Sequence, residues 1–579
     1  MSEEQSTSTS KGPEGATSSH TLHTADGTGL DYIARADWLS IRRREKTIAE
    51  MFHVAYVAAG EPDDLSDSGE SATRERPVTF VFNGGPGAAS AYLHMGAIGP
   101  KRVVFNEDGT PPAPPVQIVD NSESWLAFTD LVFIDPIGTG FSRASEPDSG
   151  EDKGGSDSQS ASIAAGVIGG SGASGASGSG QAPVFGGSGS GASGVFGGSG
   201  ASGSGAEKSN GETQPEREFY GFKRDLESLG EFIRSFLSKH KRWQSPVFIA
   251  GESYGGFRVG KLARMLQEQY GVGLNGAYLI SPALELQSLD SSDYDVLPWV
   301  DTLPTFSLAA AAHGRRDAVR RSSAATHDRS TSAGHGGALT EEQIREIRDG
   351  AERFAVRELT PLLVLGSSLE ERERSRVLSR LARFTGLSPA FTKRKAGRID
   401  IRGFARELLA DERRVAGLYD ASVAITDPYP DRDRYDGPDA TLMAIDRVFS
   451  GGINTQLRSH IGLDTERDYH LLSFDVNRQW KVDFDRHALQ SQIGATDDLR
   501  YALQLNPYMH VRISHGIYDL VTPYFASERI VANMKLDAET RKRVSLRHYA
   551  GGHMFYTWKR SREAFARDAR EFYRKATGG

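Results

Sequence analysis

The chain has 579 residues, of which 38% are hydrophobic and 25% are charged, as in soluble globular proteins. Its formal net charge of −8 gives no general attraction to nucleic acid or to an anionic membrane, so neither is expected as a partner. Cysteine is absent, which excludes disulfides, thiolate metal sites and cysteine nucleophiles. Met1–His20 lacks the apolar core of a signal peptide and no long apolar run follows, so a cytoplasmic location is expected.

The first part of the chain changes from a polar tail to strand-like patterns. Residues 1–20 are rich in Ser, Thr, Glu and Gly, and we expect them to be disordered because they can bury little. Between about Leu22 and Gly60 the residues alternate as in antiparallel strands. Short continuous apolar runs occur at residues 78–82, 131–134, 277–280 and 511–513. Such runs are typical of strands that are buried on both faces of a mostly parallel sheet.

Two long segments interrupt these strand patterns. Residues 150–212 are mostly Gly, Ser and Ala and are expected to form a flexible surface insertion; a mobile lid or an interaction segment is the alternative. Residues 300–440 carry mainly helical patterns, with a disordered loop expected at about 308–337. The predicted organisation is therefore a core in two parts, 21–299 and 441–579, with a mainly helical cap between them.

A motif for a nucleophile follows the strand-like run Pro246–Ala250. The next residues are Gly251-Glu252-Ser253-Tyr254-Gly255, and a plausible helix comes after them. A strand that breaks into Gly-x-Ser-x-Gly and then a helix is typical of the nucleophile elbow of α/β-hydrolases. The pattern predicts Ser253 as nucleophile in an α/β-hydrolase fold, with a mostly parallel central sheet and a helical cap insertion. A turn retained by an inactive descendant is the structural alternative.

An acid and a base are also predicted. A serine hydroxyl needs a base to take its proton, and the base needs a carboxylate to orient it. In α/β-hydrolases the acid and the histidine follow the serine in that order, on loops after later strands. Asp519 comes after the apolar run that ends at Ile513, and His553 comes after paired glycines beyond the candidate strand 544–549. His515 competes with His553, but it precedes the turn and is expected to be a packed or hydrogen-bonded histidine.

Two backbone N–H groups are needed to stabilise the oxyanion that forms during acyl transfer. Tyr254, directly after the serine, is expected to supply one of them. Asn83–Gly87, with the sequence Asn-Gly-Gly-Pro-Gly, follows the strand ending at Phe82, and Gly85 is the expected second donor; a plain glycine turn is the alternative. No metal-ligand spacing and no Walker-type phosphate loop occurs, so we expect neither a metal nor another cofactor.

Five motifs, in this order, resemble those of the serine carboxypeptidases, in particular their bacterial, cysteine-poor branch. They are Asn83–Gly87, Asp135–Ser142, Gly251–Gly256, Gly516-x-x-Asp519 and Gly551–Met554. The resemblance extends from about residue 30 to the C-terminus, apart from the low-complexity insertions. It implies a peptide substrate and removal of its C-terminal residue through an acyl-serine intermediate.

The resemblance also implies a site for the free carboxylate of the substrate, held by Asn83 and Glu252. Because two bare carboxylates repel each other, Glu252 is expected to be protonated and hydrolysis to favour acidic pH. The chain departs from the family at two positions, which leaves fewer groups to bind the carboxylate. Well-known eukaryotic members have a Trp at the position of Val81 and a second buried Glu at the position of Ala97. Met554 lines the leaving-group pocket or belongs to the core. A serine esterase or acyltransferase, or a catalytically inactive binding protein, are the alternative functions.

Overall fold

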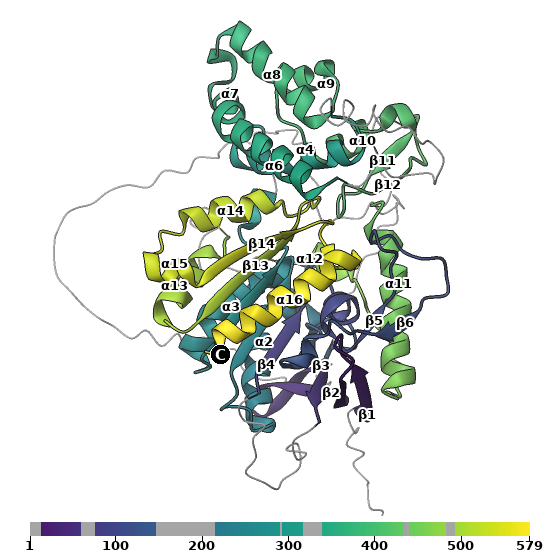
Figure 1. Cartoon of the computed structure of the whole chain (residues 1–579). Coiled ribbons are helices and arrows are strands. Elements are labelled where there is room, and N and C mark those ends of the chain that lie inside the picture. The colour runs from purple at the N-terminus through teal and green to yellow at the C-terminus, as the bar shows by residue number, and fades with distance from the viewer. Residues whose placement is uncertain are drawn as a thin grey trace, which may run out of the picture.

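The computed structural model describes residues 13–59, 76–145, 215–289, 292–316, 339–432, 435, 439–481 and 493–578. Within these residues a ten-stranded sheet lies at the centre, with helices on both faces and a further group of helices beyond one end (Figure 1). The expected insertion at 150–212 lies outside the described residues, as do residues 1–12 and most of the expected loop at 308–337.

The N-terminal part of the sheet is antiparallel. It contains β1 (Ala16–His23), β2 (Gly29–Arg43), β3 (Lys46–Ala58), β7 (Asp130–Ile134) and the short β8 (Arg143–Ala144), which pairs with β3. Because β1 begins at Ala16, the expectation that all of residues 1–20 are disordered is wrong. This polar strand is ordered by backbone pairing with β2, from Ala16 opposite Ala36 to His23 opposite Gly29, which requires little apolar burial.

The remainder of the sheet is parallel. From β7 it continues through β4 (Val78–Phe82), β9 (Val247–Glu252), β10 (Gly276–Ile280), β13 (His510–Gly516) and β14 (Val544–Tyr549). Every residue of β4, β7, β9 and β10 is buried, which explains why these strands form continuous apolar runs in the sequence. A mostly parallel sheet with helical crossovers and an antiparallel beginning is the predicted α/β-hydrolase fold.

Helices cover both faces of the sheet. On one face lie α2 (Phe222–Lys239), α3 (Tyr254–Gln269), α13 (Thr496–Leu505) and α14 (Tyr524–Asn533), whose apolar residues form one core cluster with the strands. On the other face lie α1 (Ala91–Leu93), α11 (Leu442–Asn454) and α16 (Lys559–Ala576), the last in front of the sheet in Figure 1. Smaller elements are β5 (Lys101–Val103), β6 (Ile118–Asp120), α12 (Phe474–Gln479) and α15 (Ala538–Lys542).

A group of helices, here called the cap, lies beyond the loop that follows β13 (Figure 1). It comprises α4 (Leu297–Ala312), α6 (Glu341–Phe354), α7 (Thr360–Leu365), α8 (Glu371–Thr385), α9 (Pro389–Arg394), α10 (Ile401–Glu407) and the hairpin β11 (Arg414–Ala416)–β12 (Ala424–Thr426). Since α4 continues to Ala312, the expectation of a disordered loop starting at 308 is wrong. Leu308 is fully buried, and the alanines after it are strong helix formers, so the helix is favoured by packing and by propensity.

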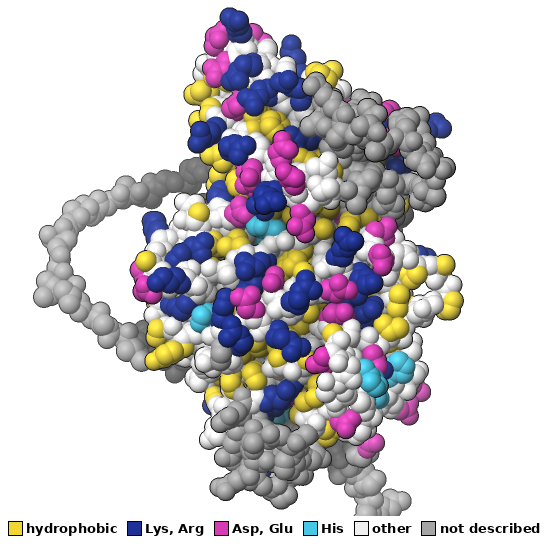
Figure 2. Space-filling view, in the orientation of Figure 1, with side chains coloured by type: hydrophobic (Ala, Val, Ile, Leu, Met, Phe, Trp, Pro, Cys, Tyr) yellow, Lys and Arg dark blue, Asp and Glu magenta, His cyan; other side chains and the backbone are white. Residues whose placement is uncertain are grey.

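Charged side chains of both signs are spread over the face of the molecule shown in Figure 2, including that of the cap. Several form pairs along or between cap helices; Arg376, for example, lies 3.0 Å from Glu358. Such charge runs are ordinary solvated helix faces. In the described part of the chain, no helix combines the length and the apolar character needed to cross a membrane.

Candidate active site

Ser253 lies at the turn between β9 and α3. Its φ of 62° and ψ of −124° are rarely adopted by a residue with a side chain, so the turn is strained. A side chain at Gly251 would lie 2.3 Å from the carbonyl oxygen of Gly255, and one at Gly255 would lie 2.7 Å from that of Phe82. Both motif glycines are therefore required by close backbone approach, which forms the expected elbow.

Asp519 and His553 are in direct contact. His553 Nδ1 lies 2.7 Å from Asp519 Oδ2, and both side chains are buried. Asp519 Oδ1 accepts hydrogen bonds from the N–H groups of Val521 at 2.8 Å and Thr522 at 3.0 Å. The Thr522 hydroxyl also donates to Asp519 Oδ2 at 2.7 Å. These donors fix the carboxylate, which in turn can orient the imidazole as an acid–base catalyst requires.

The surroundings of His553 favour its charged form. Burial lowers the pKa of His553, but the charge of Asp519, the hydrogen bond between them and the charge of Glu252 together outweigh burial and raise it. An imidazole of this kind can accept a proton from a nearby hydroxyl. The competing His515 instead lies in β13, with its Nε2 2.8 Å from the hydroxyl of Ser527.

A small cavity of about 30 Å³ brings together the predicted site residues other than Asp519 and Tyr254. Its lining includes Asn83, Gly84, Gly85, Glu252, Ser253 and His553. A side chain at Gly84 would lie 2.4 Å from the backbone nitrogen of Tyr254, so the loop after β4 lies directly against the N-terminus of α3. The backbone N–H groups of Gly85 and Tyr254 thus come from the two adjacent segments that an oxyanion hole requires.

Glu252 is buried, with 1% of its surface exposed. Asn83 Nδ2 donates to Glu252 Oε2, and the Tyr556 hydroxyl lies 3.0 and 2.9 Å from the two carboxyl oxygens. Burial raises the pKa of Glu252 to about 7, although the charge of His553 and the hydrogen bonds from Tyr556 and Asn83 act against it. A carboxyl group with this pKa holds its proton at acidic pH and can then hydrogen-bond to another carboxylate.

Three residues of the site were not predicted from the sequence. Tyr556 follows His553 closely, so its position in the chain could have indicated it; its ring occupies the space beside Gly96. Tyr419 and Asp420 lie between β11 and β12 of the cap and contact the loop of His553. Nothing in the local sequence around Tyr419 signals this contact with a segment so much later in the chain.

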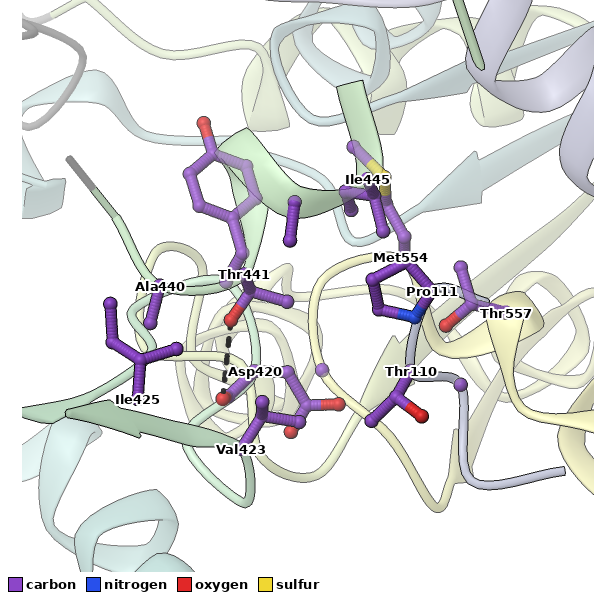
Figure 3. A pocket seen from close by; sticks show the side chains of 14 residues that line it. Thr110, Pro111, Asp420, Val423, Ile425, Ala440, Thr441, Ile445, Met554 and Thr557 are labelled. Carbon is purple, nitrogen blue, oxygen red and sulfur yellow. Dashed lines mark hydrogen bonds between the residues drawn. The ribbon is translucent and has the colours of Figure 1, made fainter. Parts of the chain in front are cut away.

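A larger cavity of about 160 Å³ is shown in Figure 3. The two cavities share Tyr419 and Met554, so Met554 lines them both. The wall is mainly apolar, and its aliphatic residues are Pro111, Val423, Ile425, Ala440, Ala444 and Ile445. Asp420 also lines it, and the Thr441 hydroxyl donates to the Asp420 carbonyl oxygen at 3.5 Å.

The fold and this geometry define an α/β-hydrolase of the serine hydrolase class. Comparison with protein families gives a more particular result, because residues 66–288 match the family described as serine carboxypeptidase. The resemblance of the chain to the serine carboxypeptidases is thereby confirmed, on a segment that includes the loop after β4 and the elbow.

Individual relatives cover less of the chain or are more distant. The pheromone-processing carboxypeptidase KEX1 of Verticillium alfalfae is 43% identical over 72 residues, which are 12% of this chain and 10% of that protein. The match thus spans about a tenth of that relative. Among solved structures, proline iminopeptidase of Mycobacterium smegmatis has 10% identity and a TM-score of 0.30, covering 97% of this chain and 99% of that one. A thermophilic esterase of Thermogutta terrifontis has 10% identity and a TM-score of 0.28, with the same coverage of both chains.

Proposed function

We propose that this protein is a serine carboxypeptidase, which hydrolyses the C-terminal peptide bond of a peptide through an acyl-serine intermediate. The observation that carries the proposal is the buried Glu252 beside Ser253. Its carboxyl group lines the same cavity as His553, is hydrogen-bonded to Asn83, and has a pKa raised to about 7 by burial. A plain esterase has no need of a protonated carboxyl group next to its nucleophile, whereas such a group can donate a hydrogen bond to the free carboxylate of a peptide.

The proposed reaction follows from the positions of five groups. Ser253 attacks the scissile carbonyl carbon while His553 accepts the hydroxyl proton, and Asp519 stabilises the resulting imidazolium. The N–H groups of Gly85 and Tyr254 stabilise the oxyanion. His553 then donates its proton to the leaving amine nitrogen as the bond to the C-terminal residue breaks. Water, deprotonated by His553, then attacks the acyl-serine. His553 returns this proton to Ser253 Oγ as the ester bond breaks and the shortened peptide leaves.

In this proposal, Glu252 and Asn83 bind the free carboxylate of the substrate. Protonated Glu252 has an O–H that it can donate to that carboxylate, and Asn83 adds an N–H. The protonated form predominates below the raised pKa of about 7 and is lost as the pH rises through it. Binding should therefore weaken towards alkaline pH, because two carboxylates then repel each other in a buried site.

The larger cavity is the proposed site for the side chain of the C-terminal residue. His553 delivers its proton to the leaving group, and the next residue, Met554, lines both cavities. We therefore expect the leaving group to lie on the side of His553 where the two cavities share Met554. Its aliphatic wall favours an apolar side chain.

The test compares a blocked dipeptide that has a free C-terminal carboxylate with the corresponding C-terminal amide, from about pH 4 to pH 8. We expect the free acid to be preferred at acidic pH, and Ser253→Ala to abolish its hydrolysis. Serine-dependent hydrolysis of esters without this preference would instead support an esterase or an acyltransferase. If Ser253 does not react with a fluorophosphonate probe, the protein is an inactive binding protein.

A further inference from the structure

A cap segment, residues 418–421 between β11 and β12, is hydrogen-bonded to the loop that carries the acid of the site. The N–H of Leu520 donates to the carbonyl oxygen of Leu418 at 3.1 Å. The N–H of Ala421 donates to the carbonyl oxygen of Tyr518 at 2.9 Å. Tyr518 and Leu520 flank Asp519 in the sequence, so the cap is hydrogen-bonded to the Asp519 loop on both sides of the acid.

The same cap segment holds the loop of the histidine. The N–H of His553 donates to the carbonyl oxygen of Tyr419 at 2.5 Å, and the Tyr419 ring packs edge-on against the imidazole with centroids 5.1 Å apart. A side chain at Gly552 would lie 2.0 Å from the Tyr419 carbonyl oxygen, so only glycine permits this approach. On the other side, the Ser281 hydroxyl donates to the carbonyl oxygen of His553 at 2.7 Å. The backbone of His553 is thus held between the cap and the core.

Asp420 is the charged residue of this segment, and only 5% of it is exposed. Trp558 Nε1 donates to Asp420 Oδ2 at 3.1 Å, and the N–H of Ser422 donates to Oδ1 at 3.0 Å. The Ser422 hydroxyl and the N–H of Gly552 also donate to the carboxylate. Burial raises the pKa of Asp420 to about 6, and these hydrogen bonds act against it. One carboxylate therefore joins the cap, the histidine loop and the start of α16.

We propose that Asp420 is a positioning residue for the acid–base pair: its carboxylate holds the loop Gly551–His553 against the cap and so fixes the imidazole relative to Ser253. The inference rests on the proposed function, because it takes Ser253 and His553 as the reacting pair. Asp420 itself touches no reacting atom. Because Asp420 also lines the larger cavity, the informative KM is that of an ester, which places no C-terminal residue there. For the ester, the loss of Asp420 should lower kcat and leave KM nearly unchanged, and a displacement of about 1 Å is enough for a loss of about 100-fold.

The experiment measures kcat, KM and Tm for the wild type and four variants of the full chain, on a p-nitrophenyl ester and on a blocked dipeptide. Three variants test the proposal: Asp420→Ala, Asp420→Asn and Trp558→Phe. The matched control is Asp427→Ala, at the end of the same hairpin. Asp427 is also buried, with 7% exposed, but its partners are the N–H of Tyr429 and the side chain of Arg406.

We expect Asp420→Ala to lower kcat about 10- to 100-fold on both substrates, while KM for the ester stays within about twofold. Asp420→Asn keeps one acceptor oxygen but turns its NH2 group towards either Trp558 Nε1 or the donors of Ser422, so it should recover only part of the rate. Trp558→Phe removes a single donor and should lower kcat about threefold to tenfold. Asp427→Ala should lower Tm without lowering kcat, because its partners lie away from the histidine loop.

A folded Asp420→Ala variant with unchanged kcat on the ester, or with only a raised KM for the ester, would overturn the proposal. So would an equal loss of kcat in Asp427→Ala. If Asp420→Ala does not fold, the proposal requires Trp558→Phe to lower kcat at constant KM. Failure of the proposed function is distinguishable, because the wild type would then hydrolyse the ester without cleaving the free-acid dipeptide, or would hydrolyse neither substrate. In either case a slower fluorophosphonate reaction of Ser253 in Asp420→Asn and Trp558→Phe would still report misplacement of His553.

Discussion

The nucleophile half of the site and the histidine half are built in different ways. Around Ser253, the backbone segments approach so closely that Gly84, Gly251 and Gly255 have no room for a side chain. His553 is instead held by a segment of the cap, through the Tyr419 carbonyl oxygen. The first half is thus defined by local backbone geometry, and the second by contact between distant segments. Changes far from the nucleophile can therefore impair the histidine half, whereas the nucleophile half should respond mainly to changes within it.

The largest effect should come from the contact between the acid and the base. Asp519→Asn keeps an oxygen that can accept from Val521 and Thr522, so the loop should remain folded. The amide no longer stabilises the imidazolium or selects the correct tautomer of His553, and kcat for an ester substrate should fall about 10⁴-fold. A loss below about tenfold, with an unchanged melting temperature, would show that Asp519 is not the orienting acid.

A single added methyl group should disrupt the geometry of the nucleophile half. In Gly84→Ala the new side chain would meet the backbone nitrogen of Tyr254 at 2.4 Å, so the loop after β4 must move away from the elbow. Displacing one oxyanion donor should lower kcat about 100-fold. Gly273→Ala is the matched control, because nothing lies within 4 Å of a side chain there. Equal activity of the two variants would contradict the assigned oxyanion hole.

The cavity beside the histidine half can be filled without touching the catalytic groups. Ala444→Leu places extra bulk in its wall, and kcat/KM for substrates that end in a large apolar residue should fall about tenfold. Substrates that end in Ala should be affected much less. Met443→Phe adds bulk on the exposed side of the same helix and should change neither. A uniform loss for all C-terminal residues would place the leaving side chain elsewhere.

A smaller effect should follow the loss of one hydroxyl group next to Glu252. Tyr556→Phe removes a hydrogen-bonding partner of the carboxyl group while the ring still fills the space beside Gly96. We expect KM for free-acid peptides to change about fivefold, the value of roughly one hydrogen bond. Hydrolysis of esters that lack the carboxylate should be unchanged; an equal change for both substrates would argue against this role.

The same contrast explains what the sequence could predict. Ser253 and Gly85 lie in short motifs, because a strained turn and a close backbone approach permit few residues. Asp519 and His553 could be identified from their order and from their place after apolar strands. The strands of the sheet could be predicted because strands that are buried on both faces form continuous apolar runs.

Other features depend on contacts that leave no local pattern. Asp420 is surrounded by ordinary residues of the cap and reaches the site only through the tertiary fold, so its sequence gave no indication of a role. The strand at Ala16–His23 was missed because backbone pairing with β2, rather than apolar content, orders it. The buried end of α4 at Leu308–Ala312 was missed because its apolar residues contact the core and the cap together.

The central claim is that protonated Glu252 binds the free carboxylate of the substrate. The most direct test is the pH dependence of KM for a free-acid dipeptide in the wild type and in Glu252→Gln, with an ester as control. The pKa of Glu252 is raised to about 7 by burial, so the wild-type KM should rise about tenfold for each pH unit above it. In Glu252→Gln, which stays neutral, KM should remain flat, as it should for the ester in both proteins. An identical alkaline rise in the two proteins, or a flat profile in the wild type, would contradict the account.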